Sequence, residues 1–438
     1  MTLNELIDSR PLSKIQLKTL ILCSLVLFID GFDLQALAIV VPQLAADWKV
    51  PVTAFAVALS ASLLGYGLGS AILAGMGDRF GRRVALVGGV LAVGLTTLLA
   101  VTSTSPAMLA GWRLLAGVSL GVTVANALAL ASEFVPARSR FRLIGIASCC
   151  IPLGTLVSGV AAGWLIQRFG WQGMFWTGGI APIMLGALLF GLLPESPKLL
   201  HQREGPDSPR MRRILLLMVP DLAGITLSQA VVERTRRTSV MELLAPPYRA
   251  RTLLLWALYL VGSSILFLLV SWVPTLLRQA GFSNGLAGWG AALFSLGGIG
   301  GGLLLSWAVD RDRTSEALAA GYGMAMLAAV SFGMLGPSFG SWAALLLLLG
   351  MSVSGGQVVI LGLASSFYPP LLRAAGIGWS MAVARFGTVI SPLLGGWALA
   401  AGWSGVTIMA VLGLPIGVML ILSLVIRRVW RRSDSDFV

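Results

Sequence analysis

The sequence predicts an all-α membrane protein in which twelve transmembrane helices form two pseudo-symmetric bundles of six. Hydrophobic residues make up 57% of the chain and charged residues 11%, whereas a soluble domain carries about 25% charged residues. The apolar residues fall into twelve runs, each of about 20 residues, the length that crosses the hydrocarbon of a bilayer. A basic loop after the second run is repeated after the eighth, so the two halves of the chain resemble each other.

These runs divide the chain into three segments. We expect one six-helix half over 1–193, a cytoplasmic central loop over 194–251 and a second six-helix half over 252–438. Mixed charge and prolines indicate that the central loop is a linker, with a surface helix expected around Arg212 to Glu242. The expected spans are 19–41, 53–74, 84–102, 107–133, 143–166, 174–193, 252–276, 286–309, 317–336, 342–367, 376–399 and 404–426.

The first span carries two carboxylates, Asp30 and Asp33, in the middle of an apolar run. An acidic side chain at that depth costs about 2.5–3.5 kcal/mol on insertion scales. Residues three apart share one helix face, so two ionised carboxylates would repel each other unless a cation lies near. This pattern favours a proton-carrying pair over the alternative, a carboxylate that only caps or pairs within a bundle.

Arg113, in the fourth span, is the expected partner of this pair. At 1.5 Å rise per residue, Asp33 lies roughly 22 Å from the inner end of the first span. Arg113 lies roughly 9 Å below the outer end of a core about 30 Å thick, and therefore at a similar depth. We expect Arg113 to pair with Asp33 or Asp30, while Gly117 and Gly121 let its helix approach a neighbour closely.

The loop after the second span carries the motif Gly77-Asp78-Arg79-Phe80-Gly81-Arg82-Arg83. We expect Asp78 to accept hydrogen bonds from backbone N–H groups at the start of the next helix. Arg82 and Arg83 can reach acids on neighbouring spans, with Glu133 the expected partner. Such a cluster would latch the cytoplasmic side and break when that side opens, and the alternative is a plain basic loop. The equivalent place in the second half holds Asp310 and Arg311.

Arg385 lies near the middle of the eleventh span, in a half whose spans contain no acidic residue. Arginine binds carboxylates with two parallel hydrogen bonds and stacks on aromatic rings, so this site suits an aromatic acid. The alternative partners are backbone carbonyls, Asp30 or Asp33. Side chains that could bond ring hydroxyls or stack on the ring, although each is more often simple packing, are Asn126, Gln357, Tyr66, Tyr259, Trp272 and Phe294.

The basic residues fix the expected orientation. They cluster in short loops on one side of the spans, and only Lys49, Arg168 and Arg278 fall on the other side. Both termini are therefore expected in the cytoplasm. The net charge of +13 follows from these clusters and does not indicate nucleic-acid binding. The only histidine, His201, lies in the central loop, the three cysteines have no metal-binding spacing, and no cleavable signal peptide is expected.

Over essentially its whole length the sequence resembles the major facilitator superfamily and, within it, the aromatic acid:proton symporters. The family's first-span motif is matched by Asp30-Gly31-Phe32-Asp33, and its loop motif by Asp78 to Arg83. The further matches are Arg113-x-x-x-Gly117-x-x-x-Gly121, Glu133-Phe134-x-Pro136, Gly170-Trp171, Pro194-Glu195-Ser196-Pro197, Trp272-x-Pro274 and Gly376-x-Gly378-Trp379 with Arg385. The sequence departs from the family at Ala74, Ser306 and Ala384, which concerns helix packing near these positions.

We therefore expect a proton-coupled transporter of the bacterial inner membrane that imports a hydroxybenzoate- or phenylpropanoate-like acid by alternating access. The resemblance implies that Arg385 holds the carboxylate and that Asp30 and Asp33 carry or gate the proton. The alternatives are an aliphatic acid or sugar-like substrate, or export. No ATP-binding loop, metal site or catalytic set is visible, so we expect a non-enzymatic monomer that is driven by the proton gradient and needs no cofactor.

Overall fold

The computed structural model describes residues 3–8, 10–205, 208–218, 240–246, 248–309, 311, 313–336, 338–368 and 370–434. Within these ranges twelve helices are long and apolar enough to cross a bilayer, which confirms the predicted spans. The first of them, Lys14–Trp48, extends beyond the expected span at both ends, and Ser13 and Gln16 cap its start reciprocally in a capping box.

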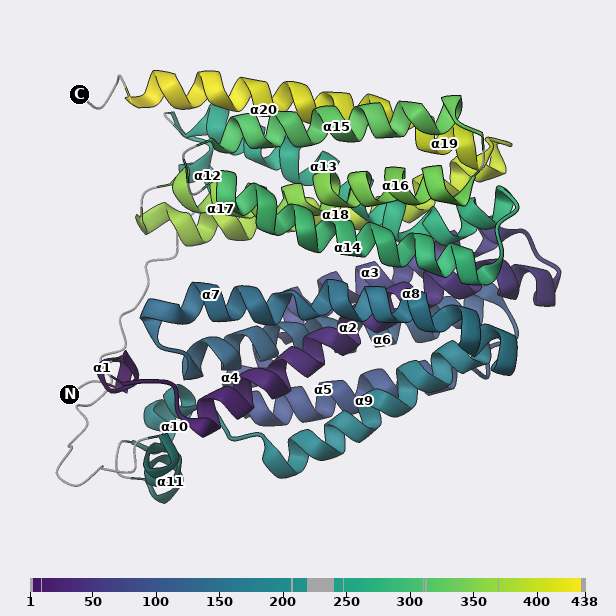
Figure 1. Ribbon diagram of the computed structural model, residues 1–438. Coiled ribbons are helices and arrows are strands. Elements are labelled where there is room, and N and C mark those ends of the chain that lie inside the picture. The colour runs from purple at the N-terminus through teal and green to yellow at the C-terminus, as the bar shows by residue number, and fades with distance from the viewer. Residues whose placement is uncertain are drawn as a thin grey trace.

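The helices form two bundles, one above the other in Figure 1, with residues 197–218 of the central segment beside the first bundle and residues 240–243 beside the second. The first bundle contains α2 (Lys14–Trp48), η1 (Val52–Phe55), α3 (Ala56–Leu68), η2 (Gly69–Leu73), α4 (Met76–Phe80), α5 (Arg82–Ala100), α6 (Pro106–Phe134), α7 (Ala137–Ser148), α8 (Cys150–Phe169) and α9 (Gln172–Leu192), preceded by α1 (Leu3–Asp8). The central segment contains α10 (Pro197–Glu204), α11 (Pro209–Met218) and α12 (Val240–Leu243). The second bundle contains α13 (Arg249–Gln279), α14 (Asn284–Val309), α15 (Thr314–Met334), α16 (Phe339–Leu349), η3 (Gly350–Ser354), α17 (Gly355–Ser366), α18 (Pro370–Ala400), α19 (Gly405–Val411) and α20 (Gly413–Asp434).

Glycines allow helices within each bundle to cross closely. A Cβ atom at Gly117 would lie 2.1 Å from the carbonyl oxygen of Ser62, and one at Gly121 would lie 2.3 Å from a backbone oxygen of α3. These distances confirm the predicted close approach of the fourth span and identify α3 as its neighbour. The second bundle repeats the arrangement, since a Cβ atom at Gly301 of α14 would lie 2.0 Å from the carbonyl oxygen of Met351.

The two bundles touch toward one end of the helices. We call the end that carries the start of α2 and the loop before Arg82 the basic end, and the other the opposite end. Toward the opposite end, Ser60 of α3 donates a hydrogen bond to the carbonyl oxygen of Val389 in α18, 2.8 Å away. There α8 also crosses α14 backbone to backbone, with a Cβ at Gly159 only 2.5 Å from the carbonyl oxygen of Gly288.

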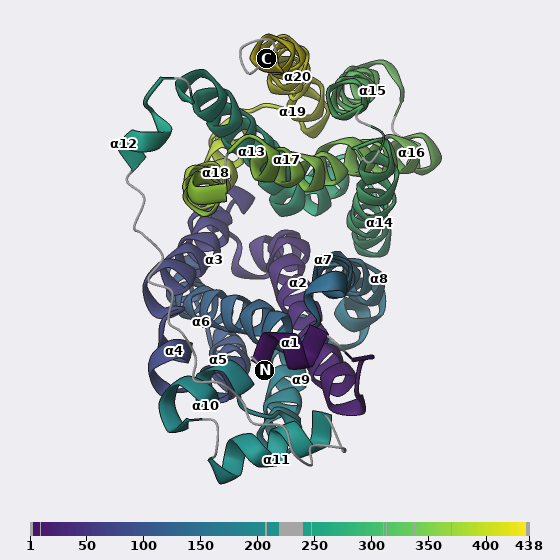
Figure 2. The same cartoon turned by 90° about the vertical axis from the view of Figure 1, so that its left-hand side faces the viewer.

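At the basic end, the elements pack within their own bundles. Among the described elements, α4 packs on α5, α7 packs on α2 and α6, and α17 packs on α13, α14 and α18. Figure 2, which looks onto this end, shows the second bundle above the first. The structure therefore has bundles that are joined at the opposite end and separate at the basic end.

Candidate functional site

Asp33 and Arg113 form a buried ion pair inside the first bundle. Arg113 donates one hydrogen bond to Oδ1 of Asp33, 2.9 Å away, and a second to Oδ2. Both side chains are 1% exposed. Ser62 accepts a further bond from Arg113 at 3.2 Å, and Thr97 donates to Asp33 at 3.2 Å. The pair confirms the prediction from helix depth, and it leaves Arg113 neutralised by two charge-assisted hydrogen bonds.

Gly31, between the two aspartates, sets the position of this stretch. A Cβ atom there would lie 1.8 Å from the carbonyl oxygen of Ile151, so only glycine allows α2 to cross α8 at this distance. Thr155 of α8 also donates a hydrogen bond to the carbonyl oxygen of Gly31, 3.2 Å away. The glycine of the Asp-Gly-Phe-Asp motif therefore holds α2 against α8 at the level of both carboxylates.

Asp30 differs from Asp33 in its partners. It lies almost one helical turn earlier and is 5% exposed. Among the described residues it has no hydrogen-bond or ion-pair partner, but it interacts electrostatically with Asp33 and with Arg385 of the second bundle. Asp30 is therefore a buried carboxylate without a direct cationic partner, whereas Asp33 has one.

Arg385 of α18 faces the first bundle. Its guanidinium carbon lies 4.5 Å from the centroid of the Tyr66 ring of α3, in a cation–π contact. Arg385 makes no ion pair within 4.0 Å of a described acidic residue and is partly exposed. Of the alternatives predicted for it, Asp33 is already paired with Arg113, and Asp30 lies within electrostatic range.

Two predicted contacts of the second bundle lie at the same level as Arg385. A Cβ atom at Gly387 would lie 2.5 Å from the carbonyl oxygen of Leu260, so α18 crosses α13 within one turn of Tyr259. On the same helix, a Cβ atom at Gly262 would lie 2.4 Å from Nε2 of Gln357. The Oη atom of Tyr259 and Nε2 of Gln357 are both buried without a hydrogen-bond partner among the described residues.

Tyr322 of α15 is a candidate that the sequence reasoning missed. It is 1% exposed, and its Oη atom also lacks a partner among the described residues. A Cβ atom at Gly356, next to Gln357, would lie 2.7 Å from that oxygen. The available signal was a tyrosine in the middle of the apolar span over 317–336. Tyr322 extends the set of unpartnered polar atoms in the second bundle.

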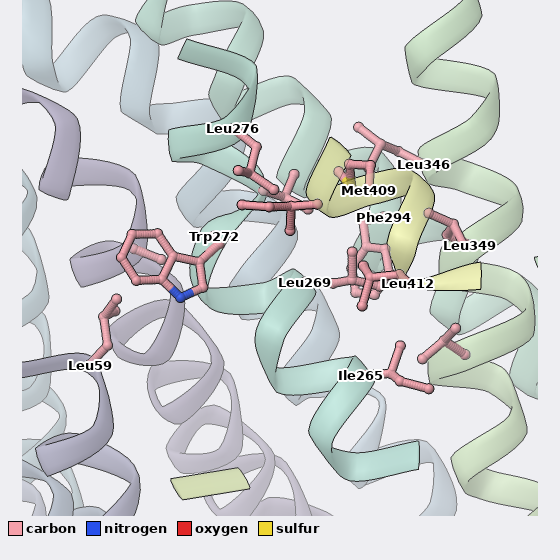
Figure 3. Close-up of a cluster of buried hydrophobic side chains, with 14 of the residues drawn as sticks. Leu59, Ile265, Leu269, Trp272, Leu276, Phe294, Leu346, Leu349, Met409 and Leu412 are labelled. Carbon is pink, nitrogen blue, oxygen red and sulfur yellow. The ribbon is translucent and has the colours of Figure 1, made fainter. Parts of the chain in front are cut away.

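Three predicted substrate contacts have other neighbours in the structure. Asn126 belongs to the loop cluster at the basic end, because its side chain accepts from Arg82 at 3.1 Å and donates to the carbonyl oxygen of Val122 at 2.8 Å. Trp272 is fully buried and donates to the carbonyl oxygen of Pro392, 3.0 Å away. Figure 3 shows Trp272 and Phe294 in an apolar cluster, where Phe294 is 3% exposed. Helix depth alone does not fix which way a side chain points, and Asn126 and Trp272 bond to partners other than Arg385.

Arg82 is the centre of the cluster at the basic end. It lies 2.7 Å from Asp78 and 3.4 Å from Glu133, which confirms the predicted contact with the fourth span. The Arg82 and Glu133 side chains are 16% and 13% exposed. The nearby Arg79 lies over the Phe80 ring, with 5.4 Å from the guanidinium carbon to the ring centroid. The cluster thus fixes the short helix α4 against α5 and α6.

Glu195, not Asp78, accepts the backbone N–H at the start of α5. Its Oε1 atom accepts from the N–H of Arg83 at 3.2 Å, next to Gly81, whose φ of 116° only glycine adopts readily. The expectation for Asp78 was wrong because the chain returns from α9 directly beneath this turn. The Arg83 side chain donates to the carbonyl oxygen of Phe190 and lies over its ring. The sequence analysis named Glu195 only as part of a family motif and assigned it no contact.

The breaking of this cluster on opening stays a prediction. All the partners of Arg82 and Arg83 lie in the first bundle or in the segment directly after it. The bonds are intact although the bundles are separate at this end, because they do not run between bundles. In the second bundle, Arg311 stacks on Trp307, with its guanidinium carbon 3.5 Å from the ring centroid. Asp310 lies outside the described residues.

Comparison with known proteins finds one family, and the relatives below are all named as transporters of aromatic acids. The model of the Major Facilitator Superfamily matches residues 23–370 and 276–436. The chain is 34% identical to the 4-hydroxybenzoate transporter PcaK of Pseudomonas aeruginosa over 93% of this chain and 92% of that protein. It is 32% identical to a gallate transporter of Pseudomonas putida over 93% and 91%. It is 30% identical to the 3-(3-hydroxy-phenyl)propionate transporter of Escherichia coli over 90% and 89%.

Two solved structures share the fold. The inward-open xylose transporter XylE of E. coli superposes with a TM-score of 0.68 at 15% identity, covering 93% of this chain and 95% of that one. A bacterial homologue of the human lysosomal transporter Spinster, inward-facing and unoccupied, also gives 0.68 at 14% identity, covering 94% and 95%. The predicted twelve-helix architecture with two halves is that of these transporters.

Proposed function

The chain belongs to the major facilitator superfamily and, within it, to the aromatic acid transporters, and from this premise we propose that it carries an aromatic carboxylate together with protons. It is a membrane transporter and not an enzyme. The observation that carries the substrate class is Arg385, a cation without an ion pair among the described residues, which lies between the bundles against an aromatic ring.

The carboxylate would bind Arg385, and the ring would take its place beside Tyr66. A guanidinium meets both oxygens of a carboxylate in its own plane, and its flat face also stacks on aromatic rings. Tyr259 and Gln357 have buried polar atoms that need partners, and hydroxyl groups on a substrate ring can supply them. The site therefore suits hydroxylated aromatic acids, the class named for the relatives in the comparison.

The proton would bind Asp30, because Asp33 is held in the ion pair with Arg113. Ionised Asp30 lies within electrostatic range of Arg385 and competes with the substrate for its charge. Protonation of Asp30 removes that competition and leaves Arg385 available to the carboxylate. Substrate and proton would thus bind together, which is the requirement for symport. The Asp33–Arg113 ion pair would keep its charges unchanged while Asp30 takes up and releases the proton.

We infer that the basic end faces the cytoplasm of a bacterial inner membrane, because basic loops are retained on that side. The structure, with its bundles separate at that end, then corresponds to a state open to the cytoplasm. From this state the substrate would be released into the cell, so the proposed direction of transport is import. Both bundles of one chain supply the site, so a monomer suffices. The proton gradient is the energy source and no cofactor is needed.

Uptake into proteoliposomes tests this function. Purified protein in vesicles with an acidic exterior should accumulate labelled 4-hydroxybenzoate, and a protonophore should abolish the accumulation. Gallate should compete, whereas xylose and an aliphatic acid such as succinate should not. Accumulation that does not depend on the pH gradient would refute proton coupling. Competition by succinate or xylose without competition by gallate would refute the substrate class.

A further inference from the structure

The helix α11 of the central segment has two different faces. Met211, Ile214 and Leu215 are buried in the apolar cluster that contains Leu20 of α2 and Leu189 of α9. The opposite face is exposed and forms an open hollow of about 370 Å³. Its lining residues are Pro209, Arg212, Arg213, Leu216 and Leu217.

The placement of α11 relates this hollow to the membrane. Figures 1 and 2 show α11 at the basic end, at the outer edge of the first bundle and across the direction of the transmembrane helices. A helix in that position runs parallel to the bilayer surface. Its buried face packs on α2, and we infer from this position that α11 lies at the level where the hydrocarbon gives way to headgroups.

The exposed face carries apolar and positive groups side by side. Leu216 and Leu217 are 47% and 56% exposed, although the helix has an apolar core contact on its other face. Arg212 and Arg213 are four residues before them, on the same side of the helix. Neither arginine makes an ion pair or a side-chain hydrogen bond with a residue that the structure describes.

We propose that α11 binds the headgroup of an anionic phospholipid. The guanidinium groups of Arg212 and Arg213 would bond the phosphate, and Leu216 and Leu217 would contact the first carbons of the acyl chains. Both charged residues that line the hollow are positive, so an anionic headgroup is attracted to it more strongly than a zwitterionic one. This proposal does not depend on which substrate the protein carries.

Native mass spectrometry of the full-length protein tests it. Protein in detergent is titrated with phosphatidylglycerol, and in a second series with phosphatidylcholine. A basic residue near an anionic surface contributes about fivefold in affinity, so Arg212→Gln with Arg213→Gln should weaken phosphatidylglycerol binding about 30-fold. Phosphatidylcholine binding should not change. The matched control is Arg210→Gln, which removes one charge from the same helix at a position 79% exposed and paired with Glu204.

The outcomes distinguish a lipid site on α11 from unspecific adsorption and from a site for free anions. Two results together support the proposal. The arginine double variant loses phosphatidylglycerol adducts whereas Arg210→Gln keeps them, and added glycerol phosphate does not displace phosphatidylglycerol from the wild type. A second variant, Leu216→Asn with Leu217→Asn, should also lose lipid while keeping its charge. Phosphatidylglycerol binding as in the wild type in the arginine double variant overturns the proposal. Equal loss in Arg210→Gln, or full competition by glycerol phosphate, overturns it as well, because the first result indicates unspecific adsorption and the second a free-anion site.

Discussion

Replacement of Arg385 is the most direct test of the substrate site. Arg385→Ala removes the cation between the bundles and leaves the substrate carboxylate opposite Asp30, with which Arg385 interacts in the wild type. Truncating one partner of a buried charge pair costs about 2–5 kcal/mol. Because Arg385 is partly exposed, we use the lower part of this range, about 2–3 kcal/mol, which corresponds to about a 30- to 150-fold loss of affinity.

Two companion variants show whether the loss comes from the proposed geometry. Arg385→Lys should recover less than about tenfold, because an ammonium group lacks the planar fork and the face that lies on Tyr66. Adding Asp30→Asn to Arg385→Ala should restore part of the affinity, since residue 30 then no longer has to take up a proton before the carboxylate binds. A structural defect at Arg385 would not be relieved by a change in the other bundle.

The assay is isothermal calorimetry of 4-hydroxybenzoate with purified protein, with melting temperatures as the control for folding. The uncharged 4-hydroxybenzamide serves as the matched ligand, and its affinity should change less than about threefold between wild type and Arg385→Ala, since it makes no ion pair. Carboxylate affinity close to wild type in Arg385→Ala would refute the reasoning and place the anion site elsewhere.

Three further predictions follow from the site. Asp30→Asn should abolish accumulation driven by a pH gradient while the protein keeps its melting temperature, whereas Asp33→Asn should lower the melting temperature, because an unpaired buried Arg113 costs about 3–5 kcal/mol; equal melting temperatures in the two variants would contradict this. Tyr259→Phe should weaken 4-hydroxybenzoate about 5- to 10-fold and leave benzoate unchanged in competition assays, since one hydrogen bond contributes about 1 kcal/mol; an equal effect on both acids would exclude a hydroxyl contact. Arg82→Gln should slow uptake at saturating substrate with ligand affinity within about twofold, because its partners lie away from Arg385; a loss of affinity at normal turnover would refute a role in switching.

The sequence predicted what depends on distance along a helix. Hydropathy located the spans, and a rise of 1.5 Å per residue placed Arg113 and Asp33 at one depth, where the structure pairs them. The contact of Arg82 with Glu133 followed in the same way from the position of Glu133 at the inner end of the fourth span.

What the sequence could not predict depends on helix rotation and on contacts between distant segments. Asn126 and Trp272 lie on the predicted spans, but their side chains bond to Arg82 and to Pro392. Glu195 caps α5 because the central segment returns beneath the loop, and no local pattern contains that contact. Of the surface helix expected around 212–242, the described parts are α11 and α12, and residues 219–239 lie outside the described ranges.

The crossing of α8 and α14 bears on how the two bundles move relative to each other. Gly159 and Gly288 bring the two backbones together there, with each glycine's missing Cβ within 2.5 Å of the other helix's carbonyl oxygen. Where side chains interdigitate, one helix cannot roll on another without repacking, but two bare backbones can act as a pivot. Spin labels on both sides of this crossing should therefore show distances that stay constant there and change toward both ends when substrate is added. A distance that changes most at the crossing itself would mean that the bundles slide apart and do not rock.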